Sequence, residues 1–174
     1  MKFGSIALSR GKNYFYIMHL AYGPRREKER ERLWNYAKQN KLIGLDLPRT
    51  VTKNWNEMSD SAKLSLRSER PVWGKQFDTF CNEMKMDDLV LVLNGWDSLL
   101  GSAEISEARH QYDKNLSEAS RGPFFDHIRC VKWIRAWNYD KRLVLPEPLR
   151  GFNNTLLKVK AHTKFWSTLT NIDI

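Results

Sequence analysis

The chain has 174 residues and a formal net charge of +9, with 29 Lys and Arg against 20 Asp and Glu. This length fits one domain with a sizeable core, and an apolar fraction of 41% excludes a disordered chain. The longest apolar runs are of strand length, which excludes a membrane-spanning helix. The two cysteines have neither metal-ligand nor redox spacing. We therefore expect a cytoplasmic protein of one domain, residues 1–174.

The positive charge is distributed unevenly along the chain. Residues 1–75 have a net charge of +9, residues 76–107 of −6 and residues 108–174 of +6. A basic balance of this size favours polyanion binding, although merely soluble proteins can be basic too. Any phosphate contacts are therefore expected in the two flanks rather than in the central segment.

The first half of the chain predicts alternating strands and helices. Residues 13–20 are aromatic and β-branched, which is typical of a strand. Residues 25–39 are good helix formers with a narrow apolar stripe, and their mixed charges are more typical of a solvated face than of a phosphate site. A short strand is predicted over 41–47. Residues 49–74 are less regular and are predicted to be an inserted arm, with a helix over 59–68.

The central segment predicts an amphipathic helix over 75–86 and then a buried hairpin. Leu89 to Leu93 is a continuous apolar run of strand length. Asn94-Gly95 favours a tight turn, because both residues tolerate positive φ, and Leu99 to Ile105 is the return strand. Trp96 therefore lies at a polar tip, where it is either a platform for stacking on a ligand or a lid folded over the core.

The last part of the chain predicts a loop, a long strand and an extension. Residues 106–123 are polar, and a loop of this length in a compact domain is commonly functional or disordered. Residues 124–137 alternate between apolar and polar side chains, which predicts a strand with one solvated face carrying His127 and several cations. Residues 138–174 are expected to pack on the sheet as a C-terminal extension, with a final strand or helix over 155–169.

Signatures of the common enzyme families are absent from the sequence. It contains no P-loop, no Gly-rich dinucleotide loop, no His-Glu-x-x-His and no Gly-x-Ser-x-Gly elbow. The four histidines are too widely spaced to predict a metal site. We therefore expect a binding module with no cofactor and no metal, rather than an enzyme.

Several short stretches occur in a characteristic order. They are Tyr14-Phe15-Tyr16-Ile17, Ile43-Gly44, the run from Met84 through Asp88 into the hairpin, Gly101-x-Ala103-x-Ile105 and Val131-Lys132-Trp133. This order resembles the PUA-like superfamily, in particular its EVE and YTH branches. The resemblance implies an α+β fold in which a small mixed, barrel-like sheet of about five to six strands is flanked by helices. Domains of this kind hold a flipped or single-stranded modified base in an aromatic pocket.

The basic, Trp-rich composition and the extra C-terminal segment also resemble the N-terminal specificity domains of McrB-type, GTP-dependent systems that restrict modified DNA. This resemblance implies duplex DNA as the ligand, with an AAA+ GTPase domain and a nuclease subunit supplying the chemistry. RNA is the alternative ligand, because many PUA-like domains read structured or modified RNA. No membrane partner is expected.

The resemblance finally implies which residues read the base. Asn94 matches the polar residue that ends the YTH hairpin strand, and it is suited, with Asp46, to the Watson–Crick edge of a base. The YTH cage Trp after the first helix is missing here, and Trp55 or Trp96 would replace it. The expected base-pocket residues are Trp96, Asn94, Asp46, Tyr112, Trp55 and Tyr22. The expected backbone-binding residues are Arg129, Lys132, Arg135, Arg121 and Lys53.

Overall fold

The computed structural model describes residues 1–19, 27–45, 53–113, 126–149, 155–161 and 163–174. The strands are β1 (Tyr14–His19), β2 (Leu42–Leu45), β3 (Leu89–Asn94), β4 (Ser98–Ile105), β5 (Gln111–Tyr112), β6 (His127–Ala136), β7 (Leu143–Val144) and β8 (Leu156–Lys160). The helices are α1 (Phe3–Ser9), α2 (Glu27–Asn40), α3 (Asp60–Glu69), α4 (Pro71–Asp78) and α6 (Lys164–Thr170). Short helical turns are η1 (Trp55–Glu57), the π-helical η2 (Thr79–Glu83) and η3 (Tyr139–Lys141).

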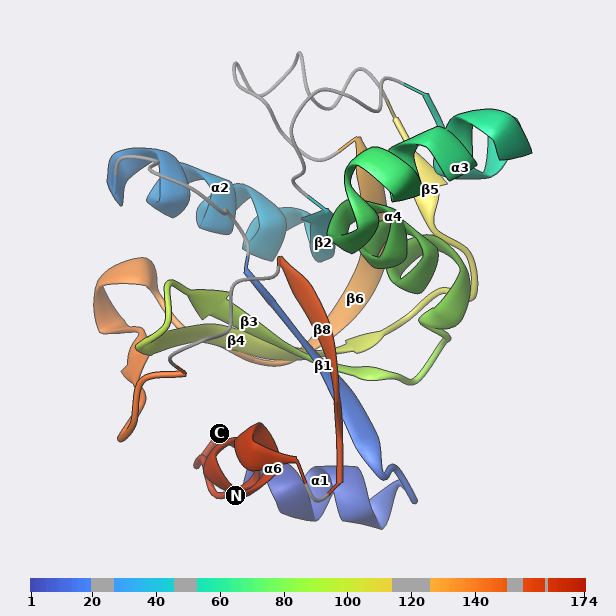
Figure 1. Cartoon of the computed structure of the whole chain (residues 1–174). Helices are drawn as coiled ribbons and strands as arrows, with labels where there is room; N and C mark the ends of the chain where they lie inside the picture. Colours follow the sequence, from blue (N-terminus) through green and yellow to red (C-terminus); the bar gives the residue numbers. More distant parts are fainter. Residues whose placement is uncertain (20–26, 46–52, 114–125, 150–154, 162) are drawn as a thin grey trace.

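The strands form one curled, half-barrel sheet with the order β2-β6-β4-β3-β1-β8 (Figure 1). β1 and β3 run parallel, and every other pair on this path is antiparallel. Helices α1 and α6 lie on one side of the sheet, and α2, α3 and α4 lie on the other. The predicted α+β class and the small mixed, barrel-like sheet of five to six strands are therefore confirmed.

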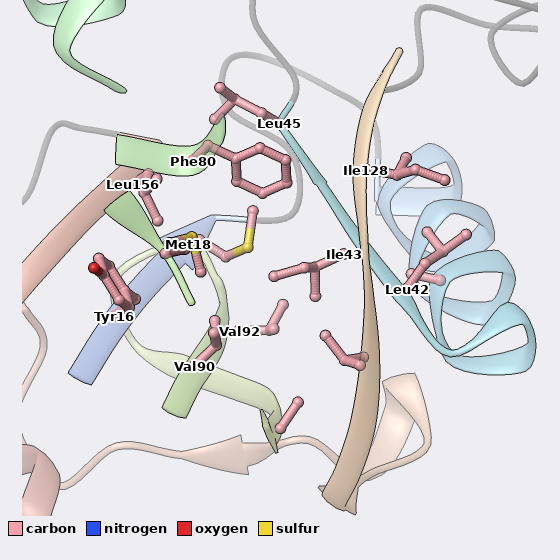
Figure 2. Close-up of a cluster of buried hydrophobic side chains, with 14 of the residues drawn as sticks. Tyr16, Met18, Leu42, Ile43, Leu45, Phe80, Val90, Val92, Ile128 and Leu156 are labelled. Atoms are coloured by element: carbon pink, nitrogen blue, oxygen red, sulfur yellow. The ribbon is translucent and has the colours of Figure 1, made fainter. Parts of the chain in front are cut away.

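The central strands are buried on both faces, as their continuous apolar runs predict. In β3, Val90 and Val92 enter the core cluster under α2, α4 and η2, whereas the alternate leucines enter a second cluster under α1 and α6. Figure 2 shows part of the first cluster, in which Val92 lies next to Ile43 of β2. A single-residue slip of β3 would exchange these two sets of side chains, so the two cores fix the strand register.

Helix α2 packs on the sheet through the predicted narrow stripe of Leu33, Trp34 and Ala37. The indole N–H of Trp34 donates to the Trp137 carbonyl over 2.8 Å. The ring lies against Gly101 in β4, where an added Cβ would come within 2.8 Å of Trp34 Cη2. Gly101 is therefore required by the close approach of α2 to the sheet.

Three further segments refine the predictions. Residues 53–74, the described part of the predicted arm, form η1, α3 and the start of α4 and add Trp55 and Leu66 to the main core cluster. Residues 155–160 of the C-terminal extension end in β8, which is a strand of the sheet itself. Helix α1 was not predicted; it buries Phe3 and Ile6 beside α6.

Candidate nucleic-acid interface

The predicted hairpin is present, and its tip is held from both sides. Strands β3 and β4 are joined by a turn in which Gly95 has a φ of 65°. The Ser98 hydroxyl donates to the Asn94 carbonyl over 2.9 Å and contacts Asp97 Oδ1 at 3.1 Å. These bonds fix the turn, so the side chains at the tip are presented from a rigid support.

Trp96 is held by its backbone while its indole stays partly in solvent. Its carbonyl accepts the backbone N–H of Leu149 over 2.7 Å, and the neighbouring Asp97 carbonyl accepts that of Leu145 over the same distance. The Trp96 side chain is nevertheless 47% exposed. Trp96 therefore does not serve as a lid over the core, and its ring is available for stacking.

Asn94 lies beside Trp96 and is only 8% exposed. Its backbone pairs with Ser98, but its carboxamide makes no hydrogen bond to any residue that the structure describes. The Asn94 carboxamide is therefore left to bond to solvent or to a ligand. The Asn94 side chain borders a groove, where a ligand can supply the missing partners.

The groove at this tip is open and has a volume of about 710 Å³, within the range of small-ligand sites. Helix α2, the hairpin tip, Arg142 at the end of η3 and the segment after β7 form its walls. The described lining residues are Glu27, Arg30, Asn94, Gly95, Trp96, Asp97, Arg142 and Pro148. We call this feature the hairpin-tip groove.

Arg142 is held at the wall of the hairpin-tip groove by two neighbours. Its guanidinium forms an ion pair with Glu27 at 3.1 Å and donates to the Tyr139 carbonyl over 2.9 Å. The guanidinium also lies 4.9 Å from the centre of the Tyr139 ring. Sequence reasoning missed Arg142 and Arg30 as groove residues, because only the tertiary fold brings α2 and the segment after η3 to the hairpin.

Two other expected pocket residues lie around His127. The Trp55 side chain is fully buried, stacks on Phe77 with ring centres 5.0 Å apart and donates its indole N–H to Asp78 over 3.0 Å. Tyr112 is half-buried in β5, with its ring centre 5.0 Å from that of His127. As folded, Trp55 belongs to the core, and Tyr112 lies at its margin.

The expected pocket residues are therefore divided between two places. Asn94 and Trp96 line the hairpin-tip groove, whereas Tyr112 belongs to β5. In Figure 1 the turn that joins β3 and β4 is at the left, and β5 is at the right near α3. Asp46 and Tyr22 lie outside the described residues, as does the expected backbone contact Arg121. The described residues that were expected to form one pocket therefore lie in two separate places on the protein.

The expected backbone contacts also differ in exposure. Lys53 is exposed, and so are Lys132 and Arg135 in the second half of β6. Arg129 is 1% exposed, which corrects the prediction that it lies on a solvated face. His127, expected on the same face, is buried as well. β2 and β5 pair with β6 here, and the guanidinium of Arg129 bonds to η2, so Arg129 cannot reach a phosphate.

Cys81, His110 and His127 are the one group of potential metal ligands found among the described residues, with donor atoms within 4.8 Å of one another. The backbone N–H of Trp55 donates to His127 Nε2 over 2.9 Å, which leaves the proton of a neutral imidazole on Nδ1. The positive guanidinium of Arg129 donates to the Cys81 carbonyl over 3.1 Å. The cluster therefore fits a neutral hydrogen-bonded network better than a cation site.

Burial lowers the pKa of His127 to about 4, with a smaller contribution from His110. The unfolded chain, in which the pKa is near 6.5, therefore takes up the proton first as the pH falls. We expect the stability due to neutral His127 to be complete above about pH 6.5 and to decline by up to about 3 kcal/mol toward pH 4. Urea unfolding across this range should show the decline in the wild type and a flatter profile in His127→Gln; identical profiles would contradict the assignment.

The amino-acid sequence matches one protein family over most of its length. A family model described as a domain of unknown function, DUF8426, matches residues 23–147. The chain belongs to this family. Curated proteins and solved structures give no significant match. The DUF8426 segment contains both strands of the hairpin and every described lining residue of the hairpin-tip groove except Pro148.

Within the part of the chain that the structure describes, no helix is both long and apolar enough to cross a bilayer.

Proposed function

We propose that this DUF8426 protein is a DNA-binding recognition domain that holds a flipped, modified base in the hairpin-tip groove. The observation that carries the proposal is the pairing of two side chains at the hairpin-tip groove, the carboxamide of Asn94, which has no partner among the described residues, and the half-exposed indole of Trp96. An aromatic face and a free amide are the two elements by which proteins bind an extruded base.

Each side chain has a distinct task in this proposal. Trp96 stacks on the base and contributes about 1–3 kcal/mol without regard to its identity. Asn94 discriminates, because its amide offers both a donor and an acceptor to the polar edge of a base. Arg30 and Arg142 lie on the groove wall, where the sugar–phosphate of the flipped nucleotide would enter.

The charge of the whole chain supports a polyanionic ligand. The net charge is +9, and Lys132 and Arg135 are exposed on β6. Cations of this kind hold the DNA backbone and make the affinity depend on salt. On the McrB-type resemblance, we place this domain in the cytoplasm within a restriction system for modified DNA, as a module that is not itself an enzyme. Its AAA+ GTPase and nuclease activities would belong to other domains or subunits.

Replacing Trp96 by alanine is expected to weaken binding to the preferred modified duplex by about 1–3 kcal/mol, or about 5- to 150-fold in Kd. The stability of the fold should be unchanged, because the indole is half-exposed. Fluorescence anisotropy with labelled duplexes measures the change in affinity.

Trp73→Ala is the matched control for this variant. Trp73 is also partly exposed, but it lies on α4 against Arg70, at 4.4 Å, and does not line the hairpin-tip groove. Its removal should leave DNA affinity unchanged. Equal affinity of Trp96→Ala and the wild type would remove Trp96 from the site, and a preference for single-stranded RNA would replace DNA as the ligand.

A further inference from the structure

Strand β8 has one edge that carries no neighbouring strand among the described residues. On its other edge it pairs antiparallel with β1, where the Thr155 carbonyl accepts the His19 N–H and the Ala161 N–H donates to the Asn13 carbonyl. In an antiparallel pair, alternate residues bond to the same partner strand. The backbone groups of Leu157 and Val159 therefore face β1.

The backbone groups of Leu156, Lys158 and Lys160 consequently point away from β1. The Leu156 N–H confirms this direction, because it donates to Gln76 Oε1 on α4 over 2.8 Å. The Lys160 carbonyl accepts from the backbone and hydroxyl of Thr163. The N–H and carbonyl of Lys158 and the N–H of Lys160 have no partner among the residues that the structure describes.

These unpaired groups border a groove between β8 and the helical segment α4–η2. The groove has a volume of about 560 Å³. Its helical wall is formed by side chains spaced along one face of the helix, and its other wall is β8. The described lining residues are Val72, Lys75, Gln76, Thr79, Glu83, Leu156, Leu157, Lys158 and Lys160. We call it the edge groove.

The charge of the edge groove is positive. Lys75, Lys158 and Lys160 line it, against Glu83 as the one carboxylate among the described lining residues. Lys158 is held in place, since its Nζ lies 4.0 Å from the centre of the Tyr14 ring. A peptide segment that carries carboxylates would thus meet complementary charge in the edge groove. A second copy of β8 would instead bring lysine next to lysine.

We propose that the edge groove binds an extended acidic segment of a partner protein, which adds to β8 as a further strand. Backbone hydrogen bonds to Lys158 and Lys160 would supply affinity, and the lysines would select acidic side chains. Val72, exposed at the end of the helical wall, offers an apolar contact for alternate residues of the segment. The edge groove is built from residues other than those of the hairpin-tip groove, so the two proposals stand independently.

The test uses the full chain and a fluorescent peptide of alternating valine and glutamate, compared with the same peptide carrying lysine in place of glutamate. We expect the acidic peptide to bind at least about tenfold more tightly than the basic one. Lys158→Pro removes the outward N–H and leaves the β1 pairing in place, so it should abolish binding. Lys158→Ala keeps that N–H and should retain most of the affinity for the acidic peptide. Thermal unfolding checks that both variants are folded.

Hydrogen exchange supplies a second readout that does not depend on a variant. The Lys158 amide should exchange faster than the Val159 amide in the free chain, because only the latter is paired with β1. The acidic peptide should slow exchange at Lys158.

Four results would overturn the proposal. One is equal binding of the two peptides, and another is peptide binding that Lys158→Pro leaves unchanged. The third is self-association that Lys158→Pro abolishes, which would make a second copy the occupant. An oligonucleotide that binds through Lys75 regardless of Lys158→Pro would make the edge groove a nucleic-acid site instead.

Discussion

Replacing Arg129 by alanine is expected to destabilise the fold by about 3–5 kcal/mol, the range seen when a large buried side chain is truncated. The guanidinium donates to the carbonyls of Phe80 over 2.6 Å, Cys81 over 3.1 Å and Ala108 over 3.4 Å. Its removal leaves these carbonyls without their donor, and each unsatisfied buried group costs about 1–3 kcal/mol. Urea unfolding followed by circular dichroism measures the loss.

Lys132→Ala is the matched control, because Lys132 is a cation on the same strand whose side chain is exposed. It should change the free energy of unfolding by no more than about 0.5 kcal/mol. Arg129→Lys keeps the charge but loses the forked geometry of the guanidinium. Its loss of unfolding free energy should therefore lie between those of Arg129→Ala and Lys132→Ala. An Arg129→Ala protein as stable as the wild type would contradict the structural role given to this residue.

Trp55→Ala is expected to destabilise the fold by a similar amount, about 3–5 kcal/mol. The indole is fully buried, stacks on Phe77 and bonds to Asp78, which is itself paired with Arg67 at 2.7 Å. Trp55→Phe keeps an aromatic ring against Phe77 but loses the indole N–H and part of the ring volume, so it should cost less than Trp55→Ala but more than one hydrogen bond, which is worth about 1 kcal/mol. Thermal and urea unfolding of the two variants measure both losses.

The same pair of variants tests whether Trp55 reads a base. If Trp55 is a core residue, Trp55→Phe should bind DNA as the wild type does. Loss of DNA binding in a stably folded Trp55→Ala protein would instead return Trp55 to the pocket, and the division of the expected site into two places would then be wrong.

The hairpin was predictable because its signals are local. The apolar run of Leu89 to Leu93 and the Asn94-Gly95 turn lie next to each other in the sequence, and the structure places β3 and β4 within one residue of the predicted bounds. Helix α1 gives a weaker signal. It has only seven residues, and Lys2 at its N-cap makes no side-chain cap bond. Its apolar face is buried against α6, which is distant in the sequence, so the local sequence does not predict it.

The burial of Arg129 was not predictable from alternation. A period of two tells which residues share a face of β6, but not whether another element covers that face. The first half of β6 is covered, whereas the second half, with Lys132 and Arg135, is partly open. The same limit applies to the hairpin-tip groove, whose cations Arg30 and Arg142 come from distant parts of the chain.

The central claim is that the hairpin-tip groove selects a modified base. It is tested most directly by the affinities of the wild-type chain for duplexes of one sequence that differ in a single base: unmodified, 5-methylcytosine, 5-hydroxymethylcytosine or N6-methyladenine. Anisotropy at two salt concentrations separates the contributions, because phosphate contacts weaken with salt and base contacts do not. We predict a preference for one modified duplex that persists at the higher salt. Equal, salt-sensitive binding to all four would contradict the account and leave a protein that binds only the DNA backbone.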